Sequence, residues 1–154
     1  MKKPTFKLQK VLDLRVWREQ EAAQRLGEAQ RRMAEAAEAA EALRRIREAG
    51  LEQLRRAHAL GGSVGELQNL SYVLGRLEAK IAEADAKRLE AEQRVDATRL
   101  EYAKAHQDRR VLERLRDRQL EQARSAIAHA ETRVMDDLAV TRHARRAAEE
   151  AAEG

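Results

Sequence analysis

The fold is decided by one short stretch, LGGSVGE at residues 60–66. Three glycines within five residues make it the strongest interruption of helical sequence in the chain. Ser63 and Glu66 have the capping-box spacing, in which the hydroxyl accepts from the amide three residues on and the carboxylate reaches back. The stretch therefore predicts a turn at residues 61–65 and a second helix that begins near Val64.

Sequence typical of long helices lies on both sides of this turn. The only proline is Pro4, 38% of the residues are charged, and 3% are aromatic. Ala, Glu, Leu and Arg dominate, a composition that favours helices over strands, which need β-branched and aromatic residues. We expect one helix over about residues 5–60 and another over about residues 64–148.

A heptad pattern runs through both expected helices. In the first, the stripe comprises Leu8, Leu12, Arg15, Glu19, Ala22, Leu26, Ala29, Met33, Ala36, Ala40, Leu43, Arg47, Gly50 and Leu54. In the second, it comprises Leu67, Leu70, Leu74, Leu77, Ile81, Ala84, Arg88, Ala91, Val95, Thr98, Tyr102, Ala105, Arg109 and Leu112. A stripe of this length predicts supercoiled helices that pack on each other along a seam.

The expected fold class is all-α: two long helices in an antiparallel coiled-coil hairpin, the second helix longer, forming a single domain over residues 1–154. If the chain reverses direction at position 62, Leu8 lies opposite Arg116. The residues beyond about 120 are then left without a partner helix. Either another chain covers this end or it is frayed. After a phase shift near residues 112–115, the stripe nevertheless continues through Ala123, Ile127, Ala130, Val134 and Leu138.

No pattern in the sequence indicates catalysis, a cofactor or a metal. The chain has no cysteine, and its four histidines lack ligand spacing. The turn lacks the lysine and the strand of a phosphate-binding loop. Asp136 and Asp137 form an acidic pair without the enclosed pocket that catalytic carboxylates need. We therefore expect a protein that is not an enzyme and acts by binding other proteins.

Charge and hydropathy limit the partners and the location. Residues 1–60 hold 14 Lys and Arg against 9 Asp and Glu, whereas the remainder holds 17 against 18. Arginines cluster at 109–118 and 142–146, but acids interleave the first cluster and stacking aromatics are missing, so we expect no nucleic-acid partner. No apolar run resembles a signal peptide or a membrane span, so we expect a cytoplasmic protein.

Three large side chains stand off the seam. Trp17 lies between the seam positions Arg15 and Glu19, so it points outward, either as a binding anchor or along the flank over arginine stems. Tyr72 and Val73, just after the turn, form a second candidate patch.

Four stretches resemble the flagellar export protein FliJ family in order and spacing over almost the whole chain. They are FKLQKVLDLR at 6–15, LSYVLGRLEAKI at 70–81, LERLRDRQ at 112–119 and MDDLA at 135–139. The resemblance implies a cytoplasmic component of the flagellar type III export apparatus, which serves motility and chemotaxis, associated peripherally with the inner membrane. It also implies a likeness to the central coiled coil of rotary ATPases.

The resemblance further implies three partners: the hexameric export ATPase, the cytoplasmic domain of the export gate, and export chaperones. The implied gate contact lies early in the second helix, where Val73 and Lys80 depart from residues of some relatives; the candidates are Tyr72, Val73, Leu77, Lys80 and Ala84. The helix termini would sit in the ATPase ring; the candidates are Trp17, Ile127, Val134, Asp136, Asp137 and Leu138.

Two other functions compete with this one. The chain also fits the equivalent stalk of a virulence type III secretion system, or a coiled-coil scaffold that self-associates.

Overall fold

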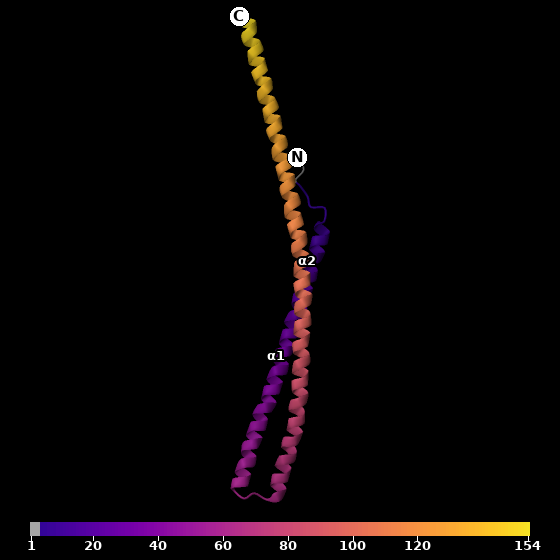
Figure 1. The fold of residues 1–154 in the computed structure, drawn as a ribbon, viewed down its shortest axis with the longest axis vertical. Helices are drawn as coiled ribbons and strands as arrows, with labels where there is room; N and C mark the ends of the chain where they lie inside the picture. Colours follow the sequence, from indigo (N-terminus) through magenta and orange to yellow (C-terminus); the bar gives the residue numbers. More distant parts are fainter. Residues whose placement is uncertain (1–3) are drawn as a thin grey trace. The chain divides into compact units, whose positions relative to one another are not determined.

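Two helices make up nearly all of the computed structural model, which describes residues 4–154 (Figure 1). Helix α1 spans Gln9–Ala59 and helix α2 spans Val64–Glu153. The helices pack against each other, the second is longer, and residues 4–154 contain no strand. The expected all-α hairpin class is therefore confirmed. The first three residues of the expected 1–154 domain lie outside the described part. That the chain forms a single domain stays a prediction.

The α1 helix begins at Gln9, a few residues after the expected start. The Gln9 amide donates to the Phe6 carbonyl at 3.2 Å, which closes a turn ahead of the helix. The Phe6 side chain is buried. Burial of this aromatic ring stabilises the chain in a non-helical path before Gln9.

The turn between the helices uses the residues that the sequence singled out. Gly61 has φ 67°, and its amide donates to His58, while the Gly62 amide donates to Ala57 at 2.8 Å. These two bonds form a Schellman motif, which ends α1 at a residue without a Cβ. The Glu66 amide donates to Ser63 Oγ at 3.2 Å, so Ser63 caps α2 at its N-terminus.

Contacts divide the chain into two compact units. Unit 1 combines the start of the chain, up to Val16, with Gln107–Gly154, and unit 2 is Trp17–His106. In unit 2 the two helices lie antiparallel on either side of the turn. Three ion pairs join α1 to α2, and their positions agree with a chain reversal near position 62. They are Arg25–Glu101 at 3.8 Å, Arg44–Asp85 at 2.5 Å and Arg47–Glu78 at 3.5 Å.

The core of unit 2 is thin and rich in alanine. Its buried side chains are Ala22, Ala29, Ala40, Ile81, Val95 and Thr98, all at expected seam positions. The Thr98 hydroxyl donates to the carbonyls of Arg94 and Val95, so burial leaves it satisfied. Small side chains bury little apolar area, so the few larger ones contribute most of the hydrophobic stabilisation.

Polar contacts supplement this thin core. The Arg44 guanidinium donates to Asp85 and to Glu41, and these hydrogen bonds raise the pKa of Arg44 above its ordinary value. The charged form of this arginine is therefore favoured at its place beside the seam.

Unit 1 contains a packed part and an open part. Leu12 is almost fully buried, and Arg15 pairs with Asp108 at 3.1 Å. Beyond position 120, only Ala123 and Ile127 are half-buried, and every other residue to Gly154 is exposed. Within unit 1, the continuing stripe therefore has no helix that covers it.

Substituting glycines in this fold should change stability in opposite directions. Gly27 and Gly75 lie inside helices, and nothing approaches within 4 Å of a Cβ added at either. We expect Gly27→Ala and Gly75→Ala each to stabilise by about 1 kcal/mol, the helix-propensity difference. Gly61→Ala should destabilise by about 1 kcal/mol because its φ is positive. Urea unfolding followed by circular dichroism tests this, and a stabilising Gly61→Ala would contradict it.

Candidate partner-binding surfaces

The gate candidates lie in unit 2, close to the turn. Tyr72 and Val73 are 66% and 52% exposed, as expected for residues off the seam. Leu77 is half-buried at a seam position, so it also serves the helix pairing. Lys80 and Ala84 line a hollow between the two helices. Tyr72 and Val73 are thus accessible to a partner without disturbing the seam, and their role stays a prediction.

Most of the ATPase candidates lie on the open end of α2. Val134 and Leu138 are exposed and four residues apart, so they share one face of the helix with the half-buried Ile127. Asp136 and Asp137 are exposed, and within residues 4–154 neither carboxylate has an ion pair. This end of α2 therefore offers an apolar stripe beside two acids. Trp17, which is 57% exposed, belongs to unit 2 instead.

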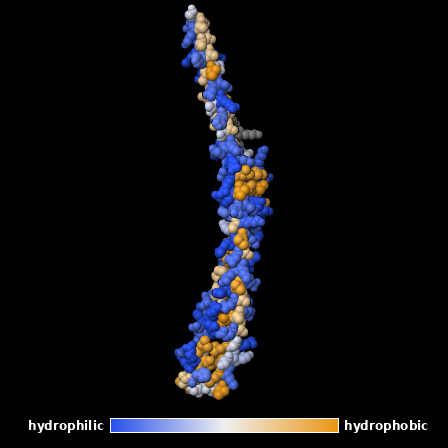
Figure 2. Space-filling model, viewed as in Figure 1, coloured by the Kyte–Doolittle hydropathy of each residue, from blue (hydrophilic) through white to orange (hydrophobic). Residues whose placement is uncertain are grey.

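Several exposed apolar side chains were missed by sequence reasoning. They include Val11, Leu14, Leu60, Val64, Val111, Met135 and Val140. Figure 2 shows apolar surface near the start of α1 and near the turn. The heptad pattern selects seam positions and ignores these residues, which stand off the seam. The signal that could have found them is the presence of large apolar residues at positions outside the heptad stripe.

The described part of the chain offers no candidate metal site. Residues 4–154 contain no group of three or more side chains suited to hold a metal. The His106 side chain has structural contacts on both sides: Nδ1 lies 3.0 Å from Glu19 Oε1, and the ring stacks on Tyr102. In the same range, neither helix carries a stretch apolar enough to cross a membrane.

Comparison with known proteins supplies the family. The family model described as Flagellar FliJ protein matches residues 4–148. The chain belongs to the FliJ family. No curated protein and no solved structure matches it significantly. The family match confirms the resemblance of the four stretches quoted above, and it spans both helices.

FliJ membership identifies a component of the flagellar type III export apparatus. The family is a non-enzymatic part of that apparatus. In this FliJ protein the exposed residues of greatest interest are those of the open end of α2 and those just after the turn.

Proposed function

We propose that this FliJ protein is a stalk-like adaptor that couples the hexameric export ATPase to the export gate. The observation that carries the proposal is the open end of α2. An apolar stripe continues there for several turns after the covering helix has ended. Exposed apolar stripes on helices are surfaces that bind a partner.

The ATPase contact is assigned to this open end. Ile127, Val134 and Leu138 supply apolar area, and Asp136 and Asp137 supply charge beside it. Side chains already exposed need no rearrangement of the hairpin before binding, which limits the cost of association. Trp17 is assigned to the same partner as an exposed aromatic anchor.

The gate contact is assigned to the residues after the turn. Tyr72 and Val73 supply the exposed part, and Leu77, Lys80 and Ala84 continue the face toward the middle of unit 2. We also assign to the protein the escort of export chaperones. Association with the inner membrane is then peripheral and occurs through these partners, in the cytoplasm.

The proposal predicts a measurable effect on the ATPase. The purified chain should raise the rate of ATP hydrolysis by its cognate export ATPase and show no hydrolysis alone. The reason is that an adaptor acts by binding one state of its partner more tightly. Steady-state phosphate release, with and without the chain, measures this.

Size measurement separates the adaptor from a scaffold. Light scattering on the chain alone should give a mainly monomeric mass. A chain that forms stable oligomers and leaves the ATPase rate unchanged would be the self-associating scaffold instead. Stimulation of an injectisome ATPase, without stimulation of a flagellar one, would assign the virulence stalk.

A further inference from the structure

Two adjoining hollows lie along one face of the helix pair in unit 2. The first has a volume of about 490 Å³ and is lined by Ala29, Arg32, Lys87, Glu90, Ala91, Gln93, Arg94 and Ala97. The second has about 320 Å³ and is lined by Ala36, Ala39, Leu43, Lys80, Glu83, Ala84 and Lys87. Because Lys87 lines both, they form one continuous surface, which we call the alanine groove. Its second hollow shares Lys80 and Ala84 with the face assigned above to the gate, whereas the first hollow contains none of the gate candidates.

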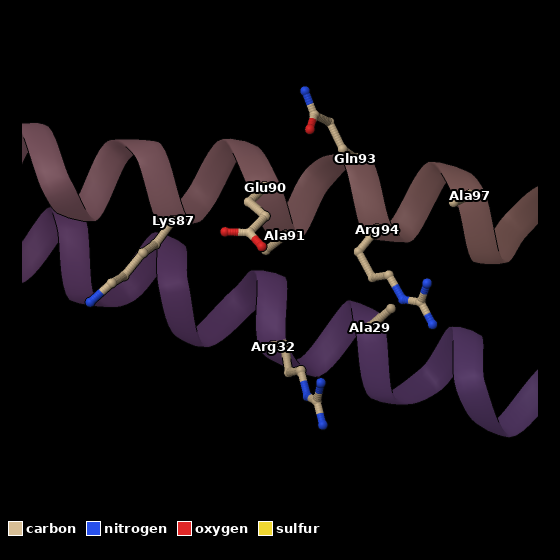
Figure 3. Close-up of a pocket in the computed structure, with 8 residues that line it drawn as sticks. All are labelled: Ala29, Arg32, Lys87, Glu90, Ala91, Gln93, Arg94 and Ala97. Atoms are coloured by element: carbon tan, nitrogen blue, oxygen red, sulfur yellow. The ribbon is translucent and has the colours of Figure 1, made fainter.

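Small side chains make the floor of the alanine groove. Figure 3 shows Ala29 of α1 and Ala91 of α2 between the two helices in the first hollow. Ala29 is buried, and Ala91 is half-buried. Alanines on a floor leave room for a third backbone to approach closely, which larger side chains would prevent.

Charged side chains form the rim. In Figure 3, Lys87 and Arg94 extend from α2 toward α1, whereas Gln93 points away from the gap. Six charged residues line the groove, four cations and two acids: Arg32, Lys80, Lys87, Arg94, Glu83 and Glu90.

Most of the cations on this rim are unpaired. Lys87 pairs with Glu83 at 3.2 Å. Within residues 4–154, Arg32, Lys80 and Arg94 make no ion pair, and all three are exposed. Glu90 is the one acid on the rim that also lacks an ion pair there. The groove therefore presents an apolar floor beneath an excess of unneutralised positive charge.

We propose that the alanine groove binds an α-helix of a partner protein, with small or apolar residues on its contacting face and Asp or Glu on both flanks. A helix placed between two others completes a three-helix arrangement. Acids on the flanks meet the unpaired cations, which gives the orientation and specificity of charge complementarity. The lining residues of α2 run from 80 to 97, so the occupant has about 18 residues, or about 27 Å of helix.

A second copy of this chain fits the groove less well. Its own uncovered stretch, at the end of α2, carries acids such as Glu121, Glu131, Asp136 and Asp137, but arginines are interspersed among them: Arg124, Arg133, Arg142, Arg145 and Arg146. These arginines would lie against the cations of the rim, and like charges at an interface are destabilising. The occupant is therefore a different protein.

The test uses the full-length chain and two synthetic helical peptides of about 18 residues. Both carry Ala and Leu on one face; one has Glu on the flanks and the other has Lys. Fluorescence anisotropy should detect binding of the Glu peptide, weakened by salt, and no binding of the Lys peptide.

Charge reversal in the first hollow provides the decisive variants. Arg32→Glu with Arg94→Glu should weaken binding of the Glu peptide about tenfold, because two attractive pairs become repulsive. The control combines Arg31→Glu with Arg76→Glu, which changes the net charge equally at exposed cations that do not line the groove. The control variant should bind as the unaltered chain does.

Four results would overturn the inference: equal binding of the two peptides, no binding of the Glu peptide, equal weakening by the two double variants, or a dimer of the chain that only the groove variant disrupts. The last result would identify a second copy as the occupant. The Arg32→Glu/Arg94→Glu variant should still stimulate the ATPase, because both residues belong to unit 2, whereas the open end of α2 belongs to unit 1. The peptide assay thus tests helix binding by the groove, and the ATPase assay separately tests the adaptor function.

Discussion

A chain cut after Leu120 should lose its stimulation of the cognate export ATPase while its helix pair stays folded. Nearly all of the removed residues are exposed, so their loss leaves few contacts broken. The removed part also contains Ile127, Val134 and Leu138, the stripe assigned to the ATPase. Loss of an interface of this kind removes hot-spot contacts of about 2 kcal/mol or more, so the affinity should fall at least about 30-fold.

Three measurements define this result: thermal unfolding by circular dichroism, affinity in a pull-down or anisotropy assay, and the rate of phosphate release. The full chain with Val134→Asp and Leu138→Asp should reproduce the loss without shortening the helix. Leu100→Asp is the matched control, because Leu100 is an exposed leucine of α2 that belongs to unit 2. Normal stimulation by the shortened chain would place the ATPase contact elsewhere.

Replacing Ile81 by alanine should destabilise the hairpin by about 3 kcal/mol. Ile81 is 5% exposed and is one of the few large apolar side chains buried in unit 2. Removing a buried isoleucine loses its transfer free energy and leaves a cavity, at a cost of about 2–5 kcal/mol. A domain of ordinary stability has about 5–15 kcal/mol in total, so this one substitution removes a large share.

Leu89 provides the matched control for Ile81. It is a large aliphatic residue of the same helix and the same unit, but it is 56% exposed. Leu89→Ala should change the free energy of unfolding by about 0.5 kcal/mol or less. Urea unfolding of the two variants measures the difference. Equal effects would mean that the stability of unit 2 does not depend on this seam.

Sequence patterns predicted most of the fold because its determinants are local. Ser63 caps α2 and Gly61 ends α1 through hydrogen bonds between residues close in sequence. The seam follows from helical periodicity, and Ala22, Ile81 and Val95 are buried where the heptad pattern expected them. The helix ends and the seam can therefore be predicted from local sequence once the chain reversal at the turn is recognised.

The start of α1 was less predictable because it depends on tertiary contacts. The heptad pattern includes Leu8, yet Leu8 lies before the helix and is exposed, while Phe6 is buried in its place. Burial of an aromatic ring outweighed the weak preference of a few residues for helix.

The candidate surfaces were predictable only in part. Exposure of Trp17, Tyr72 and Val73 follows from their positions off the seam, and it is observed. Their assignment to particular partners stays a prediction. The alanine groove was not predictable, because it combines seam alanines with charged residues beside the seam on two helices, and periodicity does not give the side-chain orientations of those charged residues.

The alanine seam has a consequence for sliding of the helices. Ala22, Ala29 and Ala36 recur at intervals of one heptad, so a shift of α1 by about 10 Å along its axis would place alanine where alanine had been. At these three positions side-chain shape therefore opposes such a slip only weakly, whereas Leu26, Met33 and Ala40, also one heptad apart, differ in size and oppose it. The turn and the discrete pairs Arg44–Asp85 and Arg47–Glu78 hold the alignment. Because salt screens exposed ion pairs, the alignment of the two helices depends on ionic strength more than the helices themselves do.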